Sequence, residues 1–471
     1  MKKLVELTII VVAAILVVLH FAGLGRMSIW IDEAVSYNCS VGPWLRFHIG
    51  ETNIPPMYYL LANLCLNIRN SEAFLRLPAA MAGALCVPVA YMLAGELGFS
   101  RVAKALIALV VSLSPWLFLY SQEARSYSLL MLFSLLSALA FLRMDRGKQW
   151  WLLGGIFLAM GFWSHYVIVF VLAALWANAS MFRREKSVLL GLSMATAIAI
   201  LLFAPWAIYA AIHPPHAVSI KKPWTGELAA FAYGWFPYFF GFSLGPSIRE
   251  LRTEGILAIA REWPMLSVGV ATILLPLLKI RGILREKGFV FCLVCSLVPP
   301  VIVFALSLIP RFNITYHPRY AAVSGIFLTM AWLWLAMKFR VRAIRWSILA
   351  IMFALMGVSV YNFFFNHRYY KEDIRSAAEV LKAERGPGEA IYIASGNVGL
   401  ALNYYYGSDF TPIYPWTDQD TIRLMGERVW LVVAREWEVS PERLEQRLMV
   451  DHRLAGQWDF TGAKLLLYER P

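Results

Sequence analysis

The sequence predicts a mostly α-helical protein that crosses a membrane about eleven times and carries a small α/β domain at its C-terminal end. Three observations predict this class. Apolar residues come in runs of about twenty, the length that a helix needs to cross the hydrocarbon of a bilayer. Hydrophobic residues make up 59% of the chain and charged residues only 15%, whereas soluble domains are about a quarter charged. After Phe365 the composition becomes polar.

Eleven apolar runs are the predicted spans, and the charges between them give each loop a side. Lys and Arg cluster in alternate loops, so the positive loops share one side if each run crosses once. Positive loops stay in the cytoplasm, which places the N-terminus inside and the C-terminal domain outside. The same pattern explains the net charge of +13, so no nucleic acid partner is expected. The runs lie near residues 4–25, 77–98, 104–121, 127–144, 150–164, 166–182, 188–212, 265–279, 289–308, 320–337 and 346–364.

The predicted domains are a transmembrane domain at residues 1–365 and a soluble extracytoplasmic domain at residues 366–471. Two long outer loops of the first domain, 26–76 and 213–264, are rich in aromatic residues and predict helices that lie on the outer membrane surface. In the second domain, helical and strand-like patterns alternate, as in a compact α/β domain. Helices are expected at 371–385 and 440–450, and strands at 390–394, 428–434 and 463–468.

Asp32 and Glu33 are adjacent carboxylates that follow the first span, in the segment WIDEA at residues 30–34. We expect them just above the outer membrane face. Two carboxylates beside apolar side chains are costly unless a partner or a reaction uses them. One interpretation is an ordinary interfacial pair that faces water, and the other is a catalytic pair.

A second polar segment, SQEARSY at residues 121–127, joins the third and fourth spans and is expected at the same outer face. Arg125 can bind a phosphate through two parallel hydrogen bonds. Glu123 can hold a metal ion or a sugar hydroxyl. The alternative is a local ion pair between the two side chains that closes a tight loop.

Further polar residues are expected at this level. His165 lies between two spans, and His317, Arg319 and Tyr320 belong to the segment HPRY that opens the tenth span. Carboxylate, guanidinium and imidazole groups gathered at one depth suit a reaction that handles a phosphate and a hydroxyl.

Three tyrosines are candidate pocket-lining residues. Tyr58 and Tyr59 follow two prolines, and Tyr127 ends the second polar segment. The alternative is an aromatic belt at the membrane interface, where tyrosine is enriched.

The order of these motifs along the chain resembles the GT-C glycosyltransferases. It is most similar to bacterial family-39-like enzymes, which are related to protein O-mannosyltransferases and lipid A aminoarabinose transferases. The resemblance extends over residues 20–330. The pair Asn53-Ile54 before the two prolines departs from the common pattern of the family, so Asn53 receives no role. The matching motifs are WxDEA (30–34), PPxYY (55–59), LRLPAA (75–80), SQEARSY (121–127), SHY (164–166) and HPRY (317–320).

The resemblance implies a role for each of the polar residues. Asp32 is implied as the catalytic base, with Glu33 beside it. Glu123 is implied to bind the acceptor or a metal ion, and His165 lies near it in the expected site. A divalent cation is the expected cofactor, with Asp32 and Glu123 as its ligands. The residues expected to face the phosphate of the donor are Arg125, His317, Arg319 and Tyr320.

The implied reaction is a single displacement that inverts the anomeric carbon. The expected donor is a sugar on polyprenyl phosphate, and the expected acceptor is the hydroxyl of a glycan, a lipid or a protein. The site would lie at the outer face of the cytoplasmic membrane, where the prenyl chain can lie in a groove between spans.

Two other classes of protein fit parts of the sequence. A transporter or flippase of lipid-linked sugars would also have many spans, but transporters carry their charges near the midplane and show two related halves. Neither feature is found in the sequence. A relative without activity, whose soluble domain binds a partner, would have no need for Asp32, Glu33, Glu123 and Arg125 together.

Overall fold

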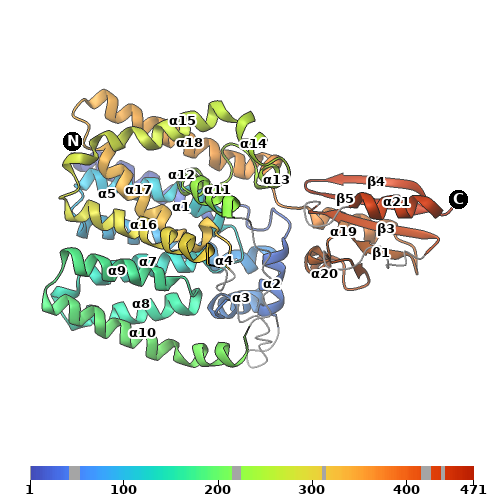
Figure 1. Cartoon of the computed structure of the whole chain (residues 1–471), viewed down its shortest axis with the longest axis horizontal. Helices are drawn as coiled ribbons and strands as arrows, with labels where there is room; N and C mark the ends of the chain where they lie inside the picture. The colour runs from blue at the N-terminus through green and yellow to red at the C-terminus, as the bar shows by residue number, and fades with distance from the viewer. Residues whose placement is uncertain (1, 42–53, 215–223, 310–313, 415–425, 436–440) are drawn as a thin grey trace.

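The computed structural model has two parts, a bundle of long helices and a small sheet domain at one end of it (Figure 1). It describes residues 2–41, 54–214, 224–309, 314–414, 426–435 and 441–471. The long helices run roughly side by side, and the N-terminus lies at the end of the bundle that faces away from the sheet domain (Figure 1). The predicted fold class, mostly α with a small C-terminal α/β domain, is confirmed.

Each predicted apolar run contains a helix, because a chain in hydrocarbon must satisfy its backbone hydrogen bonds within the segment. Serine side chains cap several of them: Ser71 accepts a hydrogen bond from the backbone of Phe74, and Ser100 from that of Ala103. The helices in these runs are α1 (Lys2–Val18), α4 (Glu72–Glu96), α5 (Arg101–Ser112), α6 (Pro115–Ser121), α7 (Tyr127–Leu142), α8 (Lys148–Ser164), α9 (Ile168–Phe182), α10 (Lys186–Ile212), α15 (Trp263–Leu274), α16 (Lys287–Ser307), α17 (Ala322–Ala336) and α18 (Arg342–Phe365), with 3-10 turns at η1 (Leu19–Phe21), η2 (Met144–Arg146), η3 (Leu275–Gly282) and η5 (Pro318–Ala321).

The predicted number of eleven spans is not confirmed. In the described residues, seven helices are long and apolar enough to cross a membrane, and eight if the bent pair α5 and α6 forms one span. The helices α3, α7 and α9 are apolar but shorter. A short helix packed among others can still lie within a bilayer, so the length of a helix alone does not decide whether it is a span.

Four short helices, α2, α3, α13 and α14, lie at the end of the bundle nearest the sheet domain, and two more, α11 and α12, lie farther from it along the bundle (Figure 1). They come from the two long loops in which surface helices were predicted. Their bounds are α2 (Ile31–Ser40), α3 (Met57–Ile68), α11 (Trp224–Gly234), α12 (Pro237–Phe240), α13 (Ile248–Thr253) and α14 (Ile256–Arg261). One of them, α2, carries both Asp32 and Glu33 in its first turn.

The C-terminal domain is a five-stranded mixed sheet with the strand order β2-β1-β3-β5-β4. The strands β2, β1 and β3 are parallel, and β5 runs antiparallel to both β3 and β4. The central strand β3 is apolar and buried from Val429 to Ala434, which gives the domain its own core. The elements are η6 (His367–Tyr369), α19 (Ile374–Glu384), β1 (Ala390–Ile393), η7 (Gly396–Val398), α20 (Gly399–Tyr405), β2 (Thr411–Pro412), β3 (Arg428–Ala434), α21 (Pro441–Asp451), β4 (Arg453–Phe460) and β5 (Ala463–Glu469).

The sheet domain contacts the loop that leads into α2. Arg375 donates hydrogen bonds to the backbone carbonyls of Gly25 at 3.0 Å and Met27 at 3.3 Å, and forms an ion pair with Glu72 at 2.8 Å. The hydroxyl of Tyr405 accepts a hydrogen bond from the backbone N–H of Ile29 and lies 2.8 Å from Glu72. The domain is therefore fastened to the segment just before Asp32.

Candidate active site

A cavity of about 300 Å³ lies where the short helices, the connector after α18 and the sheet domain meet. This volume is at the lower end of the range for small-molecule sites. Its wall combines an apolar part, with Trp30, Leu119 and Phe242, and a strongly charged part. The charged and titratable residues that line this wall include Asp32, Glu123, His317, Arg319, Lys371 and Arg435.

Asp32 and Arg319 form an ion pair on this wall, with 3.1 Å between Oδ2 of the carboxylate and Nη1 of the guanidinium. Both side chains are about a quarter exposed, so a ligand in the cavity can reach them. Burial raises the pKa of Asp32, but the positive charges of Arg125, Arg319 and Lys371 outweigh it and lower the pKa to about 2. Asp32 is therefore ionised at every physiological pH.

Arg319 is held in place by its own segment. His317 caps the turn η5, because its Nδ1 accepts a hydrogen bond from the backbone N–H of Arg319 at 3.3 Å. The guanidinium of Arg319 lies over the rings of Tyr320 and Tyr127, at 5.4 Å and 5.8 Å from their centroids. The segment HPRY thus presents one cation to the cavity in a fixed position.

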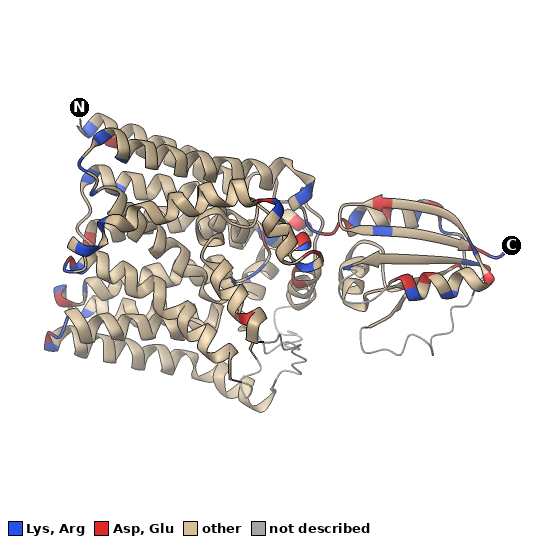
Figure 2. Cartoon of the chain, turned by 45° about the horizontal axis from the view of Figure 1, so that its top comes forward, with Lys and Arg blue, Asp and Glu red and all other residues tan. Residues whose placement is uncertain are grey.

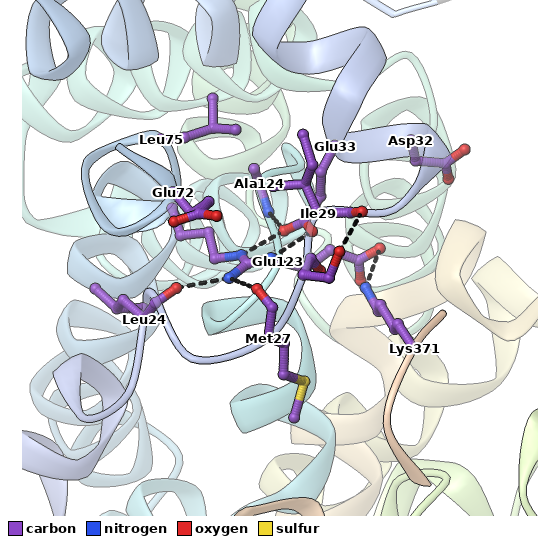
Figure 3. A network of polar contacts seen from close by, with 12 residues as sticks. Leu24, Met27, Ile29, Asp32, Glu33, Glu72, Leu75, Glu123, Ala124 and Lys371 are labelled. Carbon is purple, nitrogen blue, oxygen red and sulfur yellow. Dashed lines mark hydrogen bonds and ion pairs between the residues drawn. The ribbon is translucent and has the colours of Figure 1, made fainter. Parts of the chain in front are cut away.

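Glu33 points into the protein, away from its neighbour Asp32. Its carboxylate is completely buried and accepts two hydrogen bonds from Arg76, both at 2.7 Å, and a third from the backbone N–H of Ala124 (Figure 3). Burial raises the pKa of Glu33, and Arg76 lowers it by more, so the net shift is downward. A catalytic part for Glu33 stays a prediction, but this geometry favours a structural one.

Arg76 was not singled out from the sequence, although it lies in the matching segment LRLPAA. Its guanidinium also donates to the backbone carbonyls of Leu24, Met27 and Ser28, at 2.6, 3.0 and 3.3 Å. One arginine of α4 therefore fixes both the loop before α2 and Glu33 on α2. A signal was available in the sequence: Arg76 lies between Leu75 and Leu77 at the start of the apolar run 77–98, and a charged residue in such a position needs a buried partner.

Glu123 lies on the cavity wall and is only 5% exposed. Lys371, in the connector after α18, reaches it with 3.3 Å between Nζ and Oε1 (Figure 3). Burial raises the pKa of Glu123, Lys371 lowers it, and the nearby carboxylates of Glu33 and Asp32 raise it again, with a net upward shift. The loop of residues 121–127 therefore holds Glu123 against a cation from the other end of the chain.

Arg125 and His165 lie behind the wall, in the second layer of the site. Arg125 is 7% exposed and donates a hydrogen bond from Nη1 to the backbone carbonyl of Asp32 at 3.2 Å. His165 is 6% exposed, between the rings of Tyr127 and Tyr320. Burial lowers the pKa of His165 to about 3, and Arg125 and Arg319 add to this, so the imidazole is neutral.

The three tyrosines predicted as pocket-lining residues do not lie on the described wall of this cavity. Tyr58 is fully buried and donates a hydrogen bond to the carbonyl of Leu75 at 2.8 Å, and Tyr59 is 4% exposed in the same helix. Tyr127 is 1% exposed and packs against Tyr120 and His165. All three are packing residues around the site, because α3 and α7 turn these faces toward other helices.

The fold and the site define a multi-pass membrane protein with a charged cavity at one end of its bundle. Residues 55–220 match the family model described as dolichyl-phosphate-mannose-protein mannosyltransferase. No curated protein matches the chain.

Solved structures of GT-C enzymes share the fold over nearly the whole chain. ArnT from Cupriavidus metallidurans in the apo state has a TM-score of 0.61 at 10% identity, with 97% of each chain covered. The same protein bound to undecaprenyl phosphate has a TM-score of 0.57 at 10% identity and the same coverage. AglB, an oligosaccharyltransferase from Archaeoglobus fulgidus, in complex with an inhibitory peptide and a dolichol-phosphate, has a TM-score of 0.52 at 12% identity, with 100% of this chain and 74% of that chain covered. The predicted resemblance to the GT-C glycosyltransferases is confirmed.

Proposed function

We propose that the protein transfers a sugar from a polyprenyl-phosphate carrier to an acceptor hydroxyl. The observation that carries the proposal is the ion pair of Asp32 and Arg319 on the wall of the cavity, which puts a base and a phosphate-binding cation side by side. Such a pair suits a reaction in which a proton leaves one oxygen while negative charge builds on another. The similar ArnT structure bound to undecaprenyl phosphate supports a lipid-linked donor.

The proposed reaction is one displacement at the anomeric carbon. The carboxylate of Asp32 takes the proton of the acceptor hydroxyl, and that oxygen forms a bond to the anomeric carbon from the side opposite the carrier. The bond between this carbon and the carrier phosphate oxygen breaks, and its electron pair leaves with the phosphate. The configuration is inverted, and the products are a glycoside, polyprenyl phosphate and a protonated Asp32.

Arg319 is the proposed partner of the donor phosphate, with His317 and Tyr320 holding it in place. In the structure Arg319 pairs with Asp32, which makes that carboxylate a weak base. When a phosphate takes the guanidinium, Asp32 loses part of this pairing and becomes a stronger base. Donor binding would thus activate the base at the moment when it is needed.

Arg125 and Glu123 complete the proposed site. Arg125 adds positive charge from behind and fixes the backbone of Asp32. The Glu123 carboxylate, on the wall, is placed to accept a hydrogen bond from a hydroxyl of the acceptor or of the sugar. The acceptor is a glycan, a lipid or a protein that brings its hydroxyl into the cavity.

A divalent metal ion does not fit the carboxylates as the structure arranges them. The two predicted ligands already have cationic partners, Arg319 at 3.1 Å and Lys371 at 3.3 Å. Among the described residues, no three His, Cys, Asp or Glu side chains are grouped to hold a metal ion. The proposed reaction therefore uses the positive side chains of the protein, and no step in it passes through a metal.

The charge distribution supports the proposed orientation. Lys and Arg gather at the end of the bundle that faces away from the sheet domain, and the middle of the bundle carries few charges (Figure 2). By the positive-inside rule that end faces the cytoplasm, so the cavity and the sheet domain face outward from the cytoplasmic membrane. A transporter would place its charges near the middle of the bundle instead.

The test is reconstitution of the purified protein in liposomes with a panel of radiolabelled polyprenyl-phosphate sugars and a membrane extract as the source of acceptor. We expect loss of one donor and transfer of its label to an acceptor. Movement of intact labelled donor between leaflets, without loss of donor, would contradict a transferase and support a flippase.

A further inference from the structure

The connector between the two domains forms part of the wall of the cavity. It begins where α18 ends at Phe365, and five consecutive residues, 368–372, line the cavity. It is tied down at both sides: Arg368 pairs with Glu250 at 2.8 Å, and the backbone N–H of Asp373 donates to the carbonyl of Thr461 at 2.8 Å. The connector therefore belongs to the site and does not act as a loose tether.

Lys371 is the connector residue that contacts Glu123 on the wall of the cavity. Its ammonium lies 3.3 Å from the Glu123 carboxylate and 4.1 Å from the centroid of the Trp30 ring. The side chain of Lys371 is 23% exposed and that of Glu123 only 6%, so the pair stands at the edge of the cavity with the carboxylate inside. Trp30 supports the stem and the charge of the lysine by a cation–π contact.

The carboxylates around the site are matched to cations one by one. Glu33 has Arg76, Asp32 has Arg319, and Glu123 has Lys371. Arg76 and Arg319 come from the helical bundle, whereas Lys371 comes from the connector to the sheet domain. A buried carboxylate that loses the cation with which it forms an ion pair is strongly destabilised or becomes neutral. Glu123 thus depends on a group that the C-terminal part of the chain supplies.

We propose that Lys371 is a positioning residue of the transfer site: its ammonium holds the Glu123 carboxylate, and docking of the C-terminal domain sets where that ammonium stands. This proposal rests on the proposed function, because it assigns Glu123 to the binding of a substrate hydroxyl. It also gives the C-terminal domain a role. Asp373 ties the connector to this domain at Thr461, and Arg375 fastens the domain to the loop before α2 and to Glu72.

The proposal has a pH signature. When a substitution removes the charge of Lys371, burial and the carboxylates of Asp32 and Glu33 still raise the pKa of Glu123, and Arg319 still lowers it. The pKa of Glu123 would therefore rise further. An ionised Glu123 is required, so activity would then increase with pH over a range in which the native protein is already fully active. The titratable and charged groups that act on Glu123 from the surrounding elements are Asp32 and Glu33 of α2, Tyr58 of α3, Tyr120 of α6, Arg319 of η5 and Lys371 of the connector.

The test compares Lys371→Met and Lys371→Arg in the full-length, reconstituted protein. Met keeps the length of the side chain and removes the charge. We expect Lys371→Met to lower kcat about tenfold at neutral pH, to leave the KM of the donor unchanged, and to move the acid limb of the pH profile upward by about one pH unit. Lys371→Arg should restore most of the kcat. Lys382→Met, an exposed lysine of α19, is the matched control and should behave like the native protein.

A double-mutant cycle tests the pair of Lys371 and Glu123 without a measurement of activity. Melting temperatures are measured for Lys371→Met, Glu123→Gln and the double variant. We expect Lys371→Met to lower the melting temperature less in the Glu123→Gln background, because no carboxylate is then left unpaired. Native kcat and pH profile in Lys371→Met, or strictly additive melting temperatures, would overturn the proposal. If the native protein transfers no sugar, the proposed function fails, and the cycle still decides whether the pair exists.

Discussion

At Asp32, three positive charges outweigh burial and decide its protonation state. The pKa falls from 3.8 to about 2, so this group is ionised in the resting protein and its basicity is held low. The guanidinium of Arg319, at 3.1 Å, makes the nearest contact. The same arginine is the proposed partner of the donor phosphate, so one side chain links donor binding to the strength of the base.

Arg319→Met tests this link. Without the guanidinium, less positive charge opposes the effect of burial, and the pKa of Asp32 rises. As the pH is lowered, kcat/KM should therefore begin to fall at a higher pH than in the native protein. The KM of the donor should rise about tenfold, because the donor phosphate loses one charge-assisted hydrogen bond. Steady-state kinetics from pH 4 to 8 check both effects. Arg453→Met, at an exposed position on β4, is the control, and an unchanged profile in Arg319→Met would contradict the link.

Part of the site could be predicted at the residue scale. Asp32, Glu123, His317 and Arg319 lie on one cavity wall, because the ends of their elements meet at one end of the bundle. Lys371 was missed because the sequence predicts it as the first residue of a helix at 371–385, whereas α19 begins at Ile374 and Lys371 lies in the connector before it. The sequence also does not show which way Tyr58, Tyr59 and Tyr127 face, because the face that a helix buries depends on its neighbours, and the structure places these three side chains outside the lining of this cavity.

At the scale of elements, the position of α2 depends on a clamp from α4. Arg76 of α4 joins the Glu33 carboxylate to three backbone carbonyls of the preceding loop. Both side chains are at most 2% exposed, so the pair is shielded from water. The clamp sets the direction of the first turn of α2 and therefore the direction of Asp32.

Glu33→Gln tests the clamp. The substitution leaves the charge of Arg76 buried without a counter-ion, so we expect a loss of about 3 kcal/mol in the free energy of unfolding. Chemical or thermal unfolding in detergent measures it. The control is Glu254→Gln, which removes a surface pair with Arg261 in which both side chains are more than a third exposed and which should cost under about 1 kcal/mol. Equal effects of the two substitutions would contradict the clamp.

The elements of the sheet domain show where sequence patterns succeed. The strands predicted at 390–394, 428–434 and 463–468 correspond to β1, β3 and β5, whose buried residues are consecutive and apolar. The strand β4 was missed, because it is an edge strand whose residues are largely exposed and carry no apolar pattern. The helix α20 was missed because it is only seven residues long.

At the scale of the whole molecule, two domains share one site. The bundle supplies the proposed base and the proposed phosphate-binding cation, and the C-terminal part supplies the connector wall and Lys371. The contacts of Arg375 and Tyr405 with the loop before α2 hold the two parts together. Composition marks the boundary after Phe365 but says nothing about docking, because docking depends on a few polar contacts between segments about 350 residues apart.

Arg375→Met tests the coupling of the domains. Its guanidinium joins backbone carbonyls of the loop to Glu72, so its loss should loosen the domain without unfolding it. We expect faster limited proteolysis in the connector and a decrease of about tenfold in kcat, a rough scale for misplacing one active-site group. Full activity together with faster proteolysis would contradict a shared site.

The most direct test of the central claim is the rate of donor consumption by Asp32→Asn in the reconstituted protein. Asparagine keeps the shape of the side chain and removes the base. We predict a decrease in kcat of at least about 100-fold, with retained binding of the donor and a native melting curve. Equal rates of donor consumption by the native protein and Asp32→Asn would show that Asp32 is not the base and would contradict the account.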